Sequence, residues 1–104
     1  MSKTFAEDVR TALRTNGSDI RKPHVFDFYL YVPMKNYAMI VANKIRRSGF
    51  TVKVSRSGRR WLVVASKTIV PATAGLADQA RFFEEIAAAV GGEFDGWEAE
   101  LIER

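Results

Sequence analysis

Few residues in this chain have side chains that could do acid–base, nucleophilic or metal chemistry. The 104 residues include no cysteine and one histidine, His24, which excludes disulfides, thiol catalysis, cysteine-bound metals and sites that need two imidazoles. Five glutamates could bind a metal or transfer protons, but each falls on a helix or strand face that we expect to be solvated: Glu84, Glu85, Glu98, Glu100 and Glu103. The sequence contains no nucleophile elbow, phosphate-binding loop or dinucleotide-binding glycine pattern. It therefore predicts no catalytic residue, no cofactor and no metal.

The cationic residues are more informative, because they are concentrated in one part of the chain. Residues 28–77 hold nine Lys and Arg and no acid, whereas residues 78–104 hold eight acids and two bases. Helix-dipole compensation explains Arg46 and Arg47, and protection of an edge strand explains Lys53. Three further arginines are expected together in one loop and exceed what solubility needs, so they suggest binding of phosphates or of an acidic protein: Arg56, Arg59 and Arg60.

Apolar periodicity and turn residues divide the chain into short helices and strands. Helices are predicted over residues 4–16, 34–48 and 74–90, the first with a capping box of Thr4 and Glu7. Strands are predicted over residues 24–32, 50–55, 61–69 and 93–102. Gly96 within the last strand indicates a bulge, and Trp97 beside it is expected to be a core anchor.

Without the first helix, the order of elements is β-α-β-β-α-β, which is the ferredoxin-like arrangement. We therefore predict an α+β fold with a four-stranded antiparallel sheet in the order 4-1-3-2, two helices on one face, and an extra N-terminal helix. This order places the basic hairpin and the acidic last strand at opposite edges. The predicted organisation is an N-terminal helix and linker over 1–23 and a ferredoxin-like domain over 24–104.

Nothing in the sequence predicts a membrane or secreted protein. No apolar run approaches the roughly 20 residues of a transmembrane helix. The N-terminus carries Glu7 and Asp8 early and lacks the apolar core of a signal peptide. We expect a cytoplasmic protein.

Four segments resemble the regulator of ribonuclease activity B family, whose members are protein inhibitors of ribonuclease E. They are residues 27–33 (DFYLYVP), Gly49 and Phe50 with Val52 and Val54, residues 61–67 (WLVVASK), and residues 92–98 (GEFDGWE). The resemblance implies a ferredoxin-like, non-enzymatic regulator that binds ribonuclease E and modulates RNA decay.

The strongest candidate surface is the sheet face that the two later helices leave open. If Phe26, Phe28 and Leu30 point to the helices, Tyr29 and Tyr31 point away from them. Placing Lys67 outward on the third strand brings Trp61 to the same open face. The predicted partner-binding residues are Asp27, Tyr29, Tyr31, Lys53, Arg56, Arg59, Arg60, Trp61 and Lys67. Asp27 is expected to pair with a base such as Lys67 or to lie at the rim.

Three hypotheses remain for this face. The first is docking of a protein partner, with ribonuclease E as the partner that the resemblance implies. The second is binding of single-stranded RNA by aromatic stacking and phosphate contacts. The third is burial of the aromatic patch by the first helix, through Phe5, Val9 and Leu13, because an exposed apolar patch needs a cover or a partner.

Overall fold

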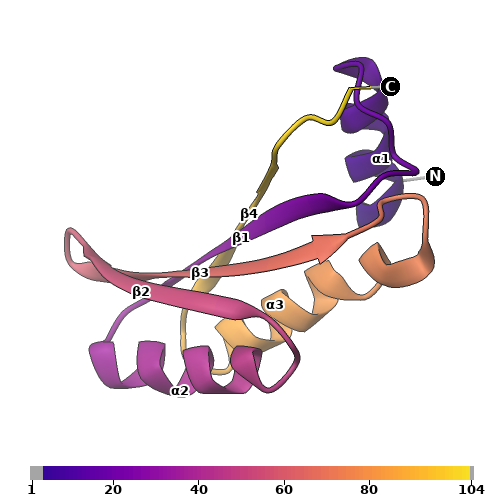
Figure 1. Cartoon of the computed structure of the whole chain (residues 1–104). Helices are drawn as coiled ribbons and strands as arrows, with labels where there is room; N and C mark the ends of the chain where they lie inside the picture. The colour runs from indigo at the N-terminus through magenta and orange to yellow at the C-terminus, as the bar shows by residue number, and fades with distance from the viewer. Residues whose placement is uncertain (1–3, 104) are drawn as a thin grey trace.

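The computed structural model describes residues 4–103 as an α+β fold (Figure 1). The first three residues of the predicted N-terminal unit and the last residue of the predicted domain lie outside the described residues. The helices are α1 (Phe5–Thr15), α2 (Lys35–Arg46) and α3 (Gln79–Ala88), with a short 3₁₀ helix η1 (Ala74–Leu76) before α3. The strands are β1 (His24–Val32), β2 (Thr51–Ser57), β3 (Arg60–Ile69) and β4 (Glu93–Ala99).

The four strands form one antiparallel sheet in the order β2-β3-β1-β4. This is the predicted strand order read from the opposite edge, and the basic β2 and acidic β4 lie at the two edges. The central strands β1 and β3 pair without interruption from His24 opposite Ile69 to Val32 opposite Trp61. Cross-strand partners share a face of the sheet, so this register decides which side chains lie together.

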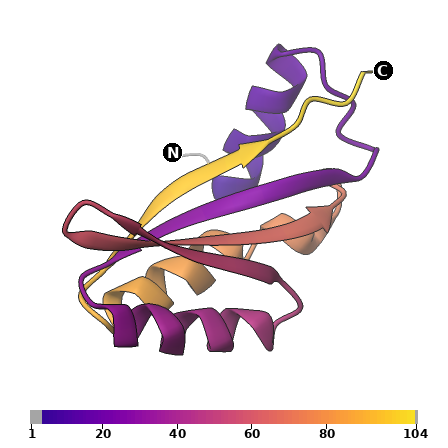
Figure 2. The same ribbon diagram turned by 60° about the vertical axis from the view of Figure 1, so that its left-hand side comes forward.

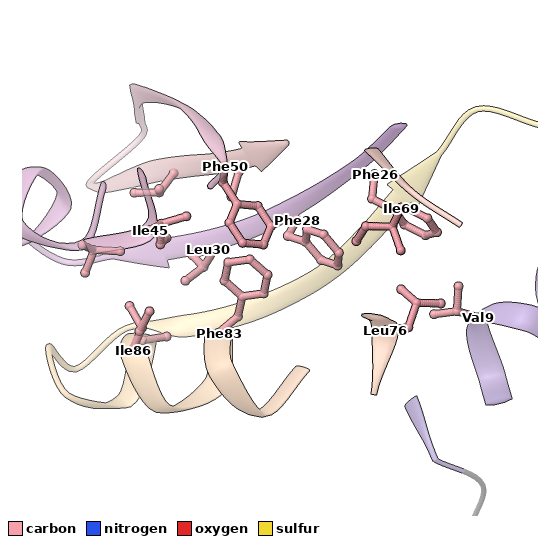
Figure 3. Close-up of a cluster of buried hydrophobic side chains, with 14 of the residues drawn as sticks. Val9, Phe26, Phe28, Leu30, Ile45, Phe50, Ile69, Leu76, Phe83 and Ile86 are labelled. Carbon is pink, nitrogen blue, oxygen red and sulfur yellow. The ribbon is translucent and has the colours of Figure 1, made fainter. Parts of the chain in front are cut away.

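Helices α2 and α3 cover one face of the sheet, the helix side, and leave the opposite open face without a helix layer (Figures 1 and 2). The core lies between them. The Phe28 ring of β1 stacks on Phe83 of α3 at 4.8 Å, and Leu30, Ile45 and Phe50 surround this pair (Figure 3). Full burial of each such side chain stabilises the fold by about 1.5–3 kcal/mol.

Helix α1 begins at the predicted cap. The Thr4 hydroxyl accepts a hydrogen bond from the Glu7 amide at 3.2 Å, which satisfies one of the free N–H groups at the helix start. One stripe of the helix is buried and consists of Ala6, Val9 and Leu13. This stripe belongs to the same core cluster as the sheet and α3.

The hypothesis that α1 covers the open face is wrong. Val9 lies toward Leu76 of η1 (Figure 3), and the Phe5 ring lies 6.3 Å from Phe94, whose side chain faces the helix side. Phe5, Val9 and Leu13 therefore extend the core on the helix side. There Val9 and Leu13 share one buried cluster with Leu76 of η1 and Phe83 of α3.

The predicted third helix divides into two parts. The Thr73 hydroxyl donates to the Val70 carbonyl at 2.7 Å and accepts from the Gly75 amide at 3.4 Å, and this local turn leads into η1. The α-helix proper begins only at Gln79 and ends at Ala88. Side-chain hydrogen bonds of threonine to nearby backbone groups compete with helix formation in this way.

A bulge in β4 corrects the predicted alternation along the last strand. Trp97 lies opposite Phe28 and Phe94 lies opposite Leu30, so two residues of β4 lie between these pairs and only one residue of β1. Gly96 has a φ of 100° and absorbs the extra residue, as the glycine in the sequence indicated. Phe94 and Trp97 therefore both face the helix side, and Trp97 packs against the core as predicted.

The segment after β4 folds back on the linker that precedes β1. β4 ends at Ala99, earlier than predicted, and the Ile102 amide then donates to the Ser18 hydroxyl at 2.7 Å. Ser18 also bonds Nε2 of the fully buried His24 at 2.7 Å, and Nδ1 of His24 bonds the Lys22 carbonyl at 2.8 Å. His24 therefore has a structural role, because its ring joins the linker to the start of β1.

Candidate functional site

An apolar band crosses the centre of the open face. Tyr31 of β1 lies opposite Leu62 of β3, and Tyr29 lies opposite Val64. All four side chains are partly buried by their neighbours in the sheet. Within residues 4–103, no helix lies over this band (Figures 1 and 2). Two of the predicted binding residues, Tyr29 and Tyr31, are thus on the expected surface.

Tyr29 is held by an acid of the neighbouring edge strand. Its hydroxyl donates to Oε2 of Glu98 at 2.7 Å. This hydrogen bond, reinforced by burial and by nearby negative charge, raises the pKa of Tyr29 to about 12. A hollow of about 430 Å³ beside this ring is lined by Tyr29, Tyr31, Asp95, Trp97 and Glu98. The phenol stays neutral at physiological pH and fixes the ring across β1 and β4.

Asp27 lies on the open face but does not pair with Lys67. The Ser66 hydroxyl of β3 donates to Oδ1 of Asp27. On the other side, Asp27 lies opposite Glu98 of β4. The predicted ion pair is wrong because Lys67 lies opposite Phe26 and so faces the helix side. Asp27 and Glu98 instead form an acidic end of the open face.

Arg60 bridges three strands at the other end of β1. Its guanidinium lies 4.3 Å from the centre of the Tyr31 ring, and Nη1 lies 2.8 Å from Oε1 of Glu93 on β4. The ion pair is exposed, so it contributes at most about 1 kcal/mol. Arg60 thereby connects the Tyr31 ring of β1 to an acid of β4.

Trp61 is not on the open face, which corrects the predicted aromatic patch. It lies opposite Val32 and Arg56, both on the helix side. Its ring is flanked by the Lys35 ammonium at 5.6 Å and the Arg56 guanidinium at 6.0 Å. The prediction failed because it assumed that Lys67 must face solvent.

Lys67 shows how a charged side chain can lie on the helix side. Its Nζ lies 5.0 Å from the centre of the Phe50 ring, close to Gly49 at the end of the α2 connection. A lysine can place its aliphatic stem against apolar residues while the ammonium reaches the rim. The lysine therefore gave no reliable signal of strand orientation.

The three hairpin arginines do not share one loop. Arg56 belongs to β2 and Arg60 to β3, and only Arg59 lies in the tight turn with Gly58. Arg56 faces the helix side opposite Trp61, whereas Arg60 faces the open side. Lys53 also faces the open side, opposite Val64. The predicted cationic cluster is therefore split between the two faces.

Sequence reasoning missed four residues of the open face. Leu62 and Val64 supply half of the apolar band, and Glu93 and Glu98 hold Arg60 and Tyr29. Had the turn been predicted with its two residues, the register of β2 on β3 would have followed. That register determines the face on which every residue of β3 lies. The available signal was the length of the turn, which the sequence analysis overestimated.

Among residues 4–103, His, Asp and Glu side chains form no group of three that could hold a metal ion. The open face instead carries cations toward β2, an apolar centre, and acids toward β4. Such an arrangement suits recognition of a partner surface with the opposite charge order.

A family match covers nearly the whole chain. Residues 3–99 match the family model described as Regulator of ribonuclease activity B. The chain belongs to this family. The resemblance expected from the sequence is thereby confirmed, and no curated protein matches the chain.

The motif residues shared with the regulator of ribonuclease activity B family build the sheet. Residues 27–33 form most of β1, and residues 61–67 form most of β3. Gly92 shows why a motif position is constrained: a Cβ there would lie 2.4 Å from the Tyr31 carbonyl oxygen and 3.0 Å from Cγ1 of Val32. These residues therefore form the two central strands, whose side chains include those of the apolar band.

Among residues 4–103, no helix combines the length and the apolar character that a bilayer crossing requires.

Proposed function

We propose that this protein is a non-catalytic regulator of RNA decay that binds a ribonuclease through its open sheet face. Membership of the regulator of ribonuclease activity B family is the observation that carries the proposal. The resemblance makes ribonuclease E the expected partner. We also propose that the β-α-β-β-α-β core is a ferredoxin-like module and that the protein acts in the cytoplasm.

The apolar band supports a protein partner. Tyr29, Tyr31, Leu62 and Val64 lie together on a face without a helix layer. Tyrosine is enriched among the residues that dominate binding energy at protein interfaces. Because the hydrogen bond to Glu98 fixes Tyr29, little side-chain entropy is lost when a partner covers it.

The charges around the band orient the partner. Lys53 and Arg60 lie toward β2 and β3, and Asp27 and Glu98 lie toward β4. Arg59 in the turn adds an exposed cation at the end of the hairpin. A partner with acids facing β2 and bases facing β4 would bind in one orientation.

Direct RNA binding is the alternative for the same face. Aromatic residues on a sheet can stack on bases. However, Tyr29 is bonded to Glu98, and Asp27 lies opposite the same glutamate, so acids border the aromatic residues where phosphates would approach. The acidic end of the face therefore favours a protein partner over RNA.

The test uses the full chain and purified ribonuclease E. The double variant Tyr31→Ala/Leu62→Ser removes the centre of the apolar band. The control Met39→Ser/Ile40→Ser removes two exposed apolar residues of α2, 42% and 58% exposed. We expect the wild-type protein and the control to bind the ribonuclease and change its cleavage of RNA.

We expect the Tyr31/Leu62 variant to bind at least about tenfold more weakly, since central interface residues commonly contribute 2 kcal/mol or more. Circular dichroism establishes that both variants are folded. Equal binding by the two variants rejects the open face as the site. Absence of binding by the wild-type protein rejects ribonuclease E as the partner, and binding of RNA oligomers alone favours the alternative.

A further inference from the structure

Strand β2 is a regular edge strand with a partner on one side only. All seven of its residues, Thr51–Ser57, pair with β3 in unbroken register. The other edge strand, β4, is interrupted by the bulge at Gly96, which disturbs main-chain pairing. Of the two edges of the sheet, β2 is therefore the one whose outer main chain is ordered for pairing with another strand.

Alternate peptide groups of β2 point to the outer edge. In an antiparallel pair, only every second residue exchanges both hydrogen bonds with the neighbouring strand. The Val52 carbonyl belongs to the outward set, because it accepts a hydrogen bond from Nη2 of Arg46 at 3.1 Å. By alternation, the N–H and C=O groups of Val54 and Arg56 also point outward.

Cations flank this edge on both faces of the sheet. Lys53 lies on the open side, while Arg56 lies on the helix side with Lys35, where both approach Trp61. Arg46 reaches the edge from α2. No acid occurs anywhere in residues 28–77. The charges therefore repel a second β2 strand and attract an acidic one.

We propose that the outer edge of β2 binds an extended, acidic segment of a partner protein as a fifth strand. Main-chain hydrogen bonds to Val54 and Arg56 would provide affinity, as in other cases of strand addition. Acidic side chains that alternate between the two faces would meet Lys53 on one face and Arg56 and Lys35 on the other. This site shares Lys53 with the open face but includes no residue of the apolar band, and it does not depend on that band.

A peptide fits this edge better than a nucleic acid. The outward N–H and C=O groups of β2 recur at the spacing of a β-strand, so another extended peptide can pair with both kinds of group. Phosphates accept hydrogen bonds and donate none. The outward carbonyl of Val54 therefore needs a donor that a peptide N–H supplies.

The test measures amide hydrogen exchange by nuclear magnetic resonance on the full chain, with a short peptide in which pairs of Glu alternate with pairs of Val, so that both faces of the added strand carry Glu. On saturation we expect the amides of Val54 and Arg56 to exchange at least about tenfold more slowly. The amides of Lys53 and Ser55, already paired with β3, should change little. A matched peptide of Lys and Val should give no protection.

Two variants test whether the slower amide exchange arises from peptide binding at the outer edge of β2. Val54→Pro removes an outward N–H, a change that edge strands tolerate, and should weaken peptide binding at least about fivefold. Lys53→Glu/Arg56→Glu should abolish it, whereas Arg14→Glu/Arg81→Glu, with the same change in net charge on exposed helix residues, should not.

Four results would overturn the proposal: no protection by the Glu peptide, equal binding of the Lys peptide, protection by single-stranded RNA in place of the peptide, or protection that appears without peptide as the protein concentration rises. The last result would assign the edge to a second copy of this chain. Because the readout is at Val54 and Arg56, its failure leaves the open-face proposal untouched.

Discussion

A single methyl group at residue 92 should destabilise the protein by displacing β1 from the turn that precedes β4. In the Gly92→Ala variant the new Cβ would lie 2.4 Å from the Tyr31 carbonyl oxygen and 3.0 Å from Cγ1 of Val32. The first distance is about 1 Å shorter than an ordinary contact. The Gly92 amide also donates to the Ala87 carbonyl at 2.8 Å, which limits how far the turn can move away.

The expected cost follows from the atoms that must move. The nearest atom belongs to the backbone of a central strand, so no flexible side chain can relieve the contact. Overpacking of this kind destabilises proteins by about 1–3 kcal/mol. For a domain of this size, each kcal/mol lowers the melting temperature by roughly 4–8 °C.

The assay compares urea and thermal unfolding of Gly92→Ala with those of Gly75→Ala. Gly75 is a matched control, because a Cβ there would meet its nearest atoms at 3.5 Å and 3.6 Å, which are ordinary contacts. We expect Gly75→Ala to stay within about 0.5 kcal/mol of the wild type. If Gly92→Ala is equally neutral, the close approach of the turn to β1 is not a constraint and the reasoning fails.

Two further predictions concern Tyr29 and α1. Spectrophotometric titration should show that one of the three tyrosines ionises near pH 12, and Glu98→Gln should lower that pKa toward 10, the ordinary value. Between these two pH values folded Tyr29 keeps the proton that the unfolded chain loses. The stabilising contribution of Tyr29 is therefore present below pH 10 and is lost as the pH rises through about 12. A titration in which Glu98→Gln has no effect contradicts the hydrogen bond. Leu13→Ala should destabilise the protein by about 2–5 kcal/mol in urea unfolding, since Leu13 is only 2% exposed, whereas the exposed Thr11→Ala should be near neutral; a neutral Leu13→Ala would mean that α1 adds nothing to the core.

The helices and strands and their order could be predicted from the sequence where the apolar periodicity and the turn residues agreed. β1 has the predicted bounds, because alternation of Phe26, Phe28 and Leu30 with polar or aromatic residues ends at Pro33. The cap at Thr4 and the bulge at Gly96 also follow from local chemistry. The division into 1–23 and 24–104 stays a prediction.

The orientation of β3 could not be predicted from its composition. Residues of both faces are apolar, because Val63 and Ala65 are buried while Leu62 and Val64 form the band on the open face. With no polar alternation, the prediction relied on Lys67, whose ammonium lies over the Phe50 ring on the helix side. The face on which α1 packs could not be predicted either, because its apolar stripe could pack against either face of the sheet.

The central claim is that a ribonuclease covers the open face, and methyl cross-saturation in the complex with ribonuclease E tests it most directly. With the protein labelled at its Leu, Val, Ile and Met methyl groups, irradiation of the unlabelled ribonuclease should attenuate Leu62 and Val64, which lie in the band. Met39 and Ile40, exposed on α2, should keep their intensity. Attenuation of the α2 methyl groups with Leu62 and Val64 unaffected would contradict the account.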